Sequence, residues 1–576
     1  MVMTVPATMA PEPRRVCAPL SGADLVCESL LAHGVDILFG YPGGAALPLY
    51  HRLNRYPLRH VLVRHEQNAA HAADGYARAT GRVGVCVATS GPGATNLVTG
   101  LATAAMDSVP LVALTGQVAT GAIGTQAFQE VDIVSIVRPI TKGAFQARSA
   151  DELPALLAEA FSLAQRGRPG PVLVDLPKDV QLAQSTFEGT LPVGSKPAPA
   201  APDAPLLAAV DHVAELLTRA ERPVLVAGHG VVIANAFAEL WELAERAGLP
   251  VGTTLLGLSS FPEWHPLALG MVGMHGTVAA NMALHHADLV LGVGMRFDDR
   301  VVGRAKDFAP GATVVHVDVD PAAFGRTARA DVAVLADARL FLQLLADRAT
   351  RRERPEWTAR LRRWRDGHRA CGVDPDSQVP TSPQVIGAIR EATDGQAVLV
   401  ADVGQHQMFA ALHFGYARPK SFFTTGGLGT MGYAVPAAMG VKLARPDEPV
   451  WAVVGDGGFQ MSAPELSTLV AEQVNLKIAV LNNGYLGMVR QWQELFYEGN
   501  YSHSRLPQPD FARLAEAHGC VGLRVTRAAD VRPAVEAALA ARGPVVLDFA
   551  VVEEETVYPM IPPGAALGEL RCADPV

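Results

Sequence analysis

Residues 451–483 read WAVVGDGGFQMSAPELSTLVAEQVNLKIAVLNN, and this stretch decides the fold. Its two apolar runs, 451–454 and 477–481, are typical of strands buried on both faces of a parallel sheet. Between them, residues 463–470 predict a helix with Pro464 in its first turn. The sequence therefore predicts a strand–helix–strand unit. Its right-handed crossover places both strand ends side by side, at the sheet edge where ligands bind.

A carboxylate and an amide occupy these two strand ends. Asp456 follows the first strand, and Asn483 follows the second. Carboxylate, amide and backbone carbonyl oxygens are hard ligands, and they suit a Mg²⁺ ion that keeps its other positions for water and phosphate. The neighbouring glycines let the backbone approach a diphosphate. A Gly-Asp-Gly triplet alone is more often a simple turn, but the double Asn one unit later makes the pattern specific.

The whole pattern resembles the cofactor motif of the thiamine-diphosphate-dependent decarboxylases and carboligases. The resemblance implies that Asp456, Asn483 and the carbonyl group of Tyr485 hold the metal that clamps the cofactor's diphosphate. It also implies that thiamine diphosphate is bound by further positions that match the family: Pro42, Gly43, Gly404, Gln405, His406, Gly429, Met431, Gly457 and Gly458.

Composition and charge exclude several classes of protein. The 576 residues are 49% hydrophobic and 18% charged, as in globular proteins with large cores. The net charge of −9 argues against a nucleic-acid binder. The first 16 residues lack the apolar core of a signal peptide, and no uninterrupted apolar run is long enough to cross a membrane. We therefore expect a cytoplasmic protein.

Cysteine usage agrees with a reducing compartment. The cysteines are scattered and form neither a CxxC pair nor a cluster with histidines, which predicts no zinc site. They are Cys17, Cys27, Cys86, Cys371, Cys520 and Cys572.

The chain divides into three α/β segments. In each segment short apolar runs alternate with helical patterns, which predicts a mainly parallel sheet flanked by helices. With the resemblance, this implies three domains of the thiamine-diphosphate-dependent enzyme fold: a pyrimidine-binding domain (17–185), a central FAD-binding domain (206–350) and a diphosphate- and Mg²⁺-binding domain (381–568). A proline-rich stretch around 185–205 and a charged stretch around 351–382 are predicted to be linkers.

Glu66 is the candidate catalytic carboxylate of the first segment. It falls where the strand-like run 61–63 passes into an alanine-rich helix, a place where a carboxylate often only interacts with the helix dipole. Two glycine-rich turns, at 40–45 and 90–96, follow neighbouring strands and favour a site instead. In the family, the matching glutamate hydrogen-bonds the cofactor's aminopyrimidine and thereby promotes removal of the thiazolium C2 proton. Because family members draw this glutamate and the metal site from different subunits, the resemblance implies a homodimer or a dimer of dimers.

Several runs resemble one branch of the family, the acetohydroxyacid synthases, over about residues 17–568. Gly429 and Met431 match the positions that hold the cofactor bent, although a methionine there is more often plain core. Trp492 matches a residue that shapes the pocket for the second 2-keto acid and favours 2-ketobutyrate over pyruvate. Ala119 stands where the family commonly has proline, at the channel mouth that binds sulfonylurea herbicides, which predicts weakened inhibition.

The middle segment carries the predicted flavin site. Glycine-rich turns after strands, arginines and an acid at a later strand end are typical of dinucleotide sites. The run RFDDR at 296–300 resembles the flavin-binding acetohydroxyacid synthases. The resemblance implies that FAD is lined by Phe128, Gly228, Gly230, His275, Arg296, Asp298 and Asp318. It implies that Arg300, Gln129 and Lys178 act with Glu66, Met431 and Trp492 on the substrates.

The resemblance implies an acetolactate synthase of branched-chain amino acid biosynthesis, dependent on thiamine diphosphate, Mg²⁺ and FAD. Such an enzyme decarboxylates pyruvate and ligates the hydroxyethyl carbanion to pyruvate or 2-ketobutyrate, giving 2-acetolactate or 2-aceto-2-hydroxybutyrate. A small regulatory subunit often accompanies it. The alternatives are another carboligase or a pyruvate oxidase on the same fold, and an inactive paralogue that only binds. Reduction of the flavin during turnover would favour the oxidase, and cofactor binding without turnover would favour the paralogue.

Overall fold

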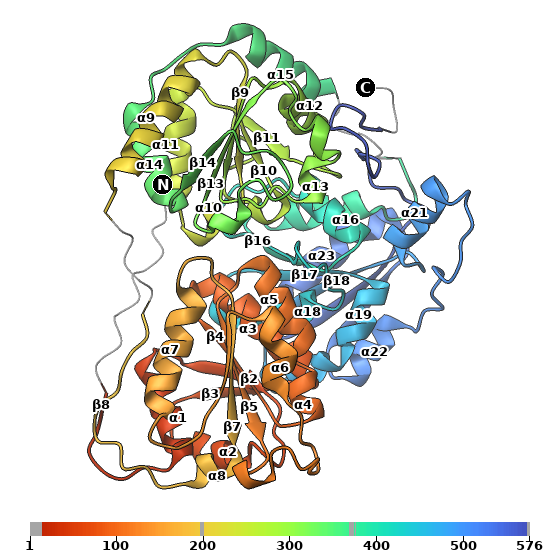
Figure 1. Cartoon of the computed structure of the whole chain (residues 1–576). Coiled ribbons are helices and arrows are strands. Elements are labelled where there is room, and N and C mark those ends of the chain that lie inside the picture. The colour runs from red at the N-terminus through yellow and green to blue at the C-terminus, as the bar shows by residue number, and fades with distance from the viewer. Residues whose placement is uncertain (1–13, 196–200, 368–373, 375, 573–576) are drawn as a thin grey trace.

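Three six-stranded parallel sheets, one per segment, form the core of the protein (Figure 1). The computed structural model describes residues 14–195, 201–367, 374 and 376–572. Figure 1 shows the first sheet with its helices in red and orange, the central one in yellow and green, and the last in cyan and blue. The predicted α/β class with mainly parallel sheets is confirmed. Within the described residues, no helix is both long and apolar enough to span a bilayer.

The first sheet has the strand order β3-β2-β4-β5-β7-β6. Its strands are β2 (Ile37–Gly40), β3 (Arg59–Leu62), β4 (Gly84–Ala88), β5 (Leu111–Gln117), β6 (Gly143–Gln146) and β7 (Pro171–Pro177). Its helices are α1 (Gly22–Ala32), α2 (Leu47–Leu53), α3 (Glu66–Thr80), α4 (Pro92–Thr95), α5 (Val98–Asp107), α6 (Ile133–Val137), α7 (Leu153–Gln165) and α8 (Lys178–Leu182). A short antiparallel pair, β1 (Arg15–Val16) and β8 (Gly189–Thr190), closes the segment.

The central sheet has the order β11-β10-β9-β12-β13-β14. Its strands are β9 (Pro223–Ala227), β10 (Val251–Thr253), β11 (Ala268–Met271), β12 (Leu289–Val293), β13 (Thr313–Asp318) and β14 (Val332–Leu335). Its helices are α9 (Ala204–Arg219), α10 (His229–Ile233), α11 (Phe237–Ala247), α12 (Val278–His286), α13 (Asp299–Val302), α14 (Ala338–Arg348) and α15 (Pro355–Gly367). Numbered within the sheet, this order is 3-2-1-4-5-6, the arrangement of dinucleotide-binding doubly wound sheets.

The last sheet has the order β16-β15-β17-β18-β20-β19. Its strands are β15 (Val398–Ala401), β16 (Phe422–Phe423), β17 (Val450–Gly455), β18 (Lys477–Asn482), β19 (Val521–Val525) and β20 (Val545–Ala550). Its helices are α16 (Ser382–Ala392), α17 (Gln405–His413), α18 (Ala434–Ala444), α19 (Asp456–Ser462), α20 (Leu466–Ala471), α21 (Gly487–Phe496), α22 (Phe511–Ala517) and α23 (Val531–Ala540).

The first and last sheets share one strand order, 2-1-3-4-6-5, when each is numbered within itself. In both, the order reverses between the first and third strands, which are neighbours in the sheet. Ligands bind at such a reversal, beyond the carboxyl ends of the strands. The glycine-rich turn 40–45 and the turn 90–96 lie at the reversal of the first sheet. Gly404 and Asp456 lie at that of the last.

Helices α3 and α18 join the first segment to the last. Gly75 and Gly440 make the close approach possible, because an added Cβ would lie 2.1 Å from the Ala437 carbonyl oxygen in one case and 2.0 Å from the Ala72 carbonyl oxygen in the other. One buried apolar cluster runs through both segments. The helix that begins at Glu66 is therefore packed directly against the helix that follows Met431.

Two expectations from the sequence were wrong in detail. The helix expected at 463–470 begins at Asp456 instead, and Pro464 lies in a 3-10 turn between α19 and α20. The presumed linker 351–382 contains α15, which packs Trp357, Leu361 and Trp364 onto the central core. Its many charged residues obscured this helical i, i+4, i+7 spacing, and each buried side chain contributes roughly 1.5–3 kcal/mol. Residues 1–13, residues 196–200 of the proline-rich stretch, and Cys371 lie outside the described residues.

The C-terminal residues return to the central segment after β20. Ile561 and Leu567 belong to the apolar cluster beneath the central sheet, and the Ile561 backbone NH donates to the Met274 carbonyl (2.8 Å). The same stretch passes the last sheet, where the Glu555 carbonyl accepts from the Gln405 side chain (2.7 Å). The segment after β20 thus ties the central and last sheets together.

Candidate cofactor and active site

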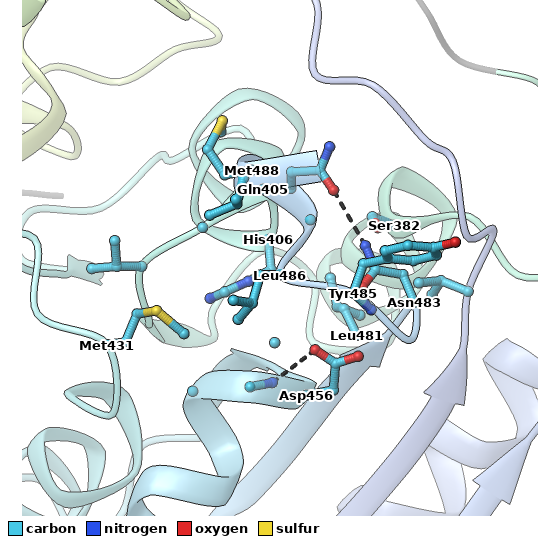
Figure 2. A pocket seen from close by; sticks show the side chains of 18 residues that line it. Ser382, Gln405, His406, Met431, Asp456, Leu481, Asn483, Tyr485, Leu486 and Met488 are labelled. Carbon is cyan, nitrogen blue, oxygen red and sulfur yellow. Dashed lines mark hydrogen bonds between the residues drawn. The ribbon is translucent and has the colours of Figure 1, made fainter. Parts of the chain in front are cut away.

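One pocket lies at the carboxyl ends of β15, β17 and β18 (Figure 2). Many of the residues predicted to bind thiamine diphosphate or the metal line it: Gly404, Gln405, His406, Met431, Asp456, Gly457, Gly458, Asn483 and Tyr485. In Figure 2, Met431 lies on one side and Asn483 with Tyr485 on the other, with His406 and Asp456 between them in the view. The parallel register brings the strand ends together, because Gly455 of β17 pairs with Leu481 of β18.

Asp456 is a buried carboxylate at the start of α19. It accepts hydrogen bonds from the backbone NH groups of Gly457 (2.7 Å) and Gly484 (2.8 Å), and from the Gln508 side chain (2.8 Å). Burial raises the pKa of Asp456 to about 6 despite these donors. Within the described ranges, no arginine or lysine forms an ion pair with it. A bound cation would restore the charged form, which is the behaviour expected of a metal ligand.

Asn483 follows β18 at the neighbouring strand end, and the next residue, Gly484, contacts Asp456. Gly484 has φ +72°, a conformation that suits glycine, and this turn aims its NH at the Asp456 carboxylate. The Asn483 side chain accepts from the Tyr485 NH (3.1 Å) and donates to Gln405 (3.3 Å). Asp456, Asn483 and Tyr485 line the same pocket, and their carboxylate, amide and backbone carbonyl oxygens are hard donors of the kind that suits Mg²⁺.

The floor of the pocket depends on glycines. Cβ atoms added at Gly404 and Gly455 would each lie 2.8 Å from the His406 ring. That ring is buried, its Nε2 has no partner among the described residues, and burial lowers the pKa of His406 to about 3. His406 is therefore neutral at physiological pH. Its unpaired ring nitrogen fits a polar ligand in the pocket.

Glu66 lies in a second cluster, at the reversal of the first sheet. It is the first residue of α3, is 9% exposed, and accepts a hydrogen bond from the Asn96 side chain (2.9 Å). A Cβ at Gly93 would come within 3.2 Å of its Oε1, and a Cβ at Gly43 would meet the Thr89 side chain, which also borders Gly93. The turn 90–96 thus borders the carboxylate directly, and the turn 40–45 meets Thr89 beside it.

Of the other predicted residues of the first segment, Gln129 and Pro42 lie in or against the two turns of this cluster. Gln129 has φ +60° and packs its backbone against Gly91. Pro42 is exposed in the first turn. Lys178 is exposed at the start of α8, next to Asp179, which accepts from the Thr120 NH (3.0 Å). Phe128 is 87% exposed on its loop. None of them lines the pocket around Asp456.

The predicted flavin residues of the central segment gather at its strand reversal. The turns after the neighbouring strands β9 and β12 touch, since a Cβ at Gly228 or Gly230 would strike Gly294. Arg296 pairs with Asp298 (3.0 Å), and Asp318 ends β13, the next strand.

His275 belongs to the same region. It is buried, its Nδ1 has no partner among the described residues, and burial lowers its pKa to about 4. Touching glycine turns, an arginine, an acid at a strand end and an unpaired buried nitrogen fit a dinucleotide with its phosphates at this edge.

Arg300 and Trp492 come together from different segments. The Arg300 guanidinium carbon lies 5.8 Å from the centre of the Trp492 ring, a cation–π contact between α13 and α21. Trp492 also packs edge-on against Phe496. Met488 and Val489 of the same helix line the pocket around Asp456. Arg300, predicted to contact substrate, and Trp492, predicted to shape the second-substrate pocket, therefore meet at the helix that lines the candidate metal pocket.

Sequence reasoning missed several contributors to the pocket. Gln508 reaches Asp456 from a loop 52 residues later, and Ser382 and Leu486 line the cavity. Asp402, at the end of β15, lies beneath Gly458. The loop position of Gln508 has no periodic pattern, but the place of Asp402 directly after a buried strand was a usable signal.

Comparisons with known proteins agree on a single family. Three family profiles match in order: the thiamine pyrophosphate enzyme N-terminal TPP-binding domain at residues 20–136, the central domain at 210–345, and the C-terminal TPP-binding domain at 402–549. Thiamine pyrophosphate is another name for thiamine diphosphate.

Curated relatives match over almost the whole chain. An acetolactate synthase large subunit of Mycobacterium tuberculosis is 50% identical over 572 residues, covering 96% of this chain and 92% of that relative. One from Corynebacterium glutamicum is 47% identical (99% and 93%). The isozyme 2 large subunit of Escherichia coli is 44% identical (96% and 99%).

Proposed function

Because the chain belongs to the thiamine-diphosphate-dependent enzymes, and among them to the acetolactate synthase large subunits, we propose that it condenses two 2-keto acids. It decarboxylates pyruvate and joins the remaining two-carbon unit to pyruvate or 2-ketobutyrate. The products are 2-acetolactate and 2-aceto-2-hydroxybutyrate. The observation that carries the proposal is the pocket at the ends of β15, β17 and β18, with Asp456, Asn483 and Met431 on its wall.

Asp456, Asn483 and the Tyr485 carbonyl hold Mg²⁺ in this proposal, and the metal holds the diphosphate of thiamine diphosphate. Burial raises the pKa of the Asp456 carboxylate, and a bound cation would favour its charged form, which supports the assignment. Gly457 and Gly458 bring the first turn of α19 up to the phosphates, where the helix N-terminus favours anions. When bound, the cofactor stabilises the negative charge that decarboxylation leaves on the 2-keto acid.

Glu66 holds a proton at the aminopyrimidine of the cofactor. Its carboxylate is held by the Asn96 side chain beside Gly93, which would restrict how it meets the ring. Glu66 does not line the pocket around Asp456 of the same chain. We therefore infer a homodimer, alone or as a dimer of dimers, in which each cofactor lies between Glu66 of one copy and Asp456 of the other.

The central segment binds FAD in this proposal. The 3-2-1-4-5-6 strand order, the touching turns at Gly228, Gly230 and Gly294, and the unpaired nitrogen of His275 support it. Arg296 and Asp318, at the ends of neighbouring strands, would line the dinucleotide. Condensation of two keto acids involves no net redox change, so the flavin is structural for this reaction.

Arg300 and Trp492 recognise the second 2-keto acid. The guanidinium binds its carboxylate, and the indole face contacts its alkyl group, which is one methylene longer in 2-ketobutyrate than in pyruvate. Lys178 and Gln129 border the route by which substrates enter. Several relatives are named large subunits, and this supports a small regulatory partner for this chain as well.

A product assay tests the proposal. The purified protein is given pyruvate alone and pyruvate with 2-ketobutyrate, each with thiamine diphosphate, Mg²⁺ or FAD left out in turn. We expect both acetohydroxyacids in the complete mixture and none without thiamine diphosphate. Flavin reduction at the turnover rate, with acetate as product, would instead indicate an oxidase. Cofactor binding without any product would contradict the proposed activity.

A further inference from the structure

The loop of residues 424–432 carries both Gly429 and Met431, and its two ends are fastened by buried carboxylates. It connects β16 to α18. Gly429 and Gly432 have φ +71° and +85°, so the loop relies on a backbone conformation that other residues rarely adopt. Leu428 in its middle is 45% exposed and makes no buried anchor. The contacts that hold this loop in place are therefore made at its two ends and by its buried residues.

Asp107 fastens the first end from another segment of the chain. Its Oδ1 accepts from the backbone NH groups of Gly427 (2.7 Å) and Gly426 (3.4 Å). Its Oδ2 accepts from Arg78 (2.9 Å), and Arg78 also donates to the Thr424 carbonyl (2.9 Å). The Asp107 side chain is 0% exposed, and its distance from Gly427 leaves no room for a Cβ there.

Asp402 fastens the other end from beneath the pocket. The Gly432 NH lies 3.0 Å from both of its carboxylate oxygens, and the Val403 NH donates to it at 2.7 Å. Asp402 is fully buried, and a Cβ added at Gly458 would approach its Oδ2 to 2.9 Å. The same carboxylate thus contacts the loop and the first turn of α19, which carries Asp456.

A hydroxyl pair anchors the loop between these ends. The side chains of Thr103 in α5 and Thr430 share a buried hydrogen bond of 2.7 Å. Thr430 stands between Gly429 and Met431. Each anchor leaves the Met431 side chain free to line the pocket. Asp107, Thr103 and Asp402 therefore restrict the backbone on both sides of Gly429 and Met431.

We propose that Asp107 and Asp402, helped by Thr103, are positioning residues that hold Gly429 and Met431 against the cofactor. The proposal rests on the proposed function, which assigns those two residues to thiamine diphosphate. In the inferred dimer, the first segment then serves two cofactors. Its Glu66 reaches the cofactor on the partner's diphosphate site, while its α5 shapes the loop of its own chain.

The test separates positioning from folding. Asp107→Asn and Asp402→Asn keep the side-chain shape but replace an acceptor with an NH₂ group that faces a donor. In the assembled enzyme with saturating thiamine diphosphate and Mg²⁺, deuterium exchange at the thiazolium C2 and cofactor affinity are measured. We expect exchange at least 10-fold slower in each variant, with cofactor affinity changed less than 3-fold because the metal ligands are intact. Exchange at the wild-type rate would overturn the proposal.

Two further variants keep the result interpretable. Asp175→Asn alters another fully buried aspartate, which accepts hydrogen bonds from Thr115 and Gln117 and has none to the loop among the described residues, and its exchange rate should stay at the wild-type value. If the aspartate variants fail to fold, Thr103→Val decides: slower exchange supports the proposal, and an unchanged rate refutes it. An equally slow Asp175→Asn variant would show a general effect of buried charge loss and also refute it. A wild type that neither binds the cofactor nor exchanges the proton would refute the proposed function instead.

Discussion

Replacing Glu66 with glutamine is the sharpest test of the assigned chemistry, because the structure predicts a large catalytic effect and a small structural one. Glutamine has the same length and can still accept from Asn96 through its amide oxygen. It also fits the space beside Gly93, where Oε1 now lies. What it cannot do is hold the proton of the aminopyrimidine as a carboxylate does.

The expected outcome follows from comparing the loss of folding stability with the rise in the activation barrier. Loss of the charge at the start of α3 and of a charge-assisted hydrogen bond costs about 1 kcal/mol of unfolding free energy. Loss of a general acid–base group slows the reaction about 10²- to 10⁴-fold, or roughly 3–5 kcal/mol in the activation barrier. The variant should therefore fold normally and bind the cofactor, yet lose nearly all activity.

The assay measures acetolactate formation, the thermal midpoint and deuterium exchange at the thiazolium C2. Glu356→Gln is the matched control, since Glu356 is an exposed glutamate in the first turn of α15 and loses the same interaction with a helix dipole. It should retain wild-type turnover. A Glu66→Gln enzyme with wild-type kcat and exchange rate would refute the role of Glu66, whereas one that fails to fold would refute the claim of a small structural effect.

Three other predictions concern specificity, inhibition and pH. Trp492→Leu removes the aromatic face beside Arg300 and should lower the preference for 2-ketobutyrate about 10-fold, as measured by the product ratio with both keto acids present; an unchanged ratio would remove Trp492 from the second-substrate site. Ala119 has φ −57° and ψ 147°, which proline adopts without strain, so Ala119→Pro should keep catalysis and increase inhibition by sulfonylureas; equal inhibition of both enzymes would count against the channel assignment. Burial lowers the pKa of His71 to about 3 from 6.5, so the unfolded chain binds more protons and stability is lost as pH falls below 6.5. By pH 5 this group alone costs about 2 kcal/mol, and His71→Phe should reduce by that amount the difference between urea unfolding free energies at pH 7 and pH 5. An undiminished difference would show that His71 is not the titrating group.

Residue order alone determined the fold class and the placing of Asp456 and Asn483 at neighbouring strand ends. Buried parallel strands are short, apolar and followed by glycines, so 451–454 and 477–481 were recognisable without coordinates, and Asp456 with Asn483 followed from the right-handed crossover rule. The sequence pattern was wrong at two helices, because it misplaced the start of one and missed the other. A proline that suits the first turn of a helix is only a local signal, and Pro464 marks a turn inside the helical stretch rather than its beginning. In α15 the charged face concealed the buried stripe.

Only the tertiary structure could decide the contacts between segments. Arg300 and Trp492 are separated by nearly two hundred residues, and Asp107 and Gly427 by 320, and no periodicity in a sequence reports such pairs. The strand orders also had to be seen, because a parallel strand can add to either edge of a sheet with the same right-handed crossover. Sequence thus specified which groups end each strand, through local apolar pattern and turn chemistry. Packing of the three sheets specified which of those groups meet, because long-range contacts depend on how buried surfaces fit together.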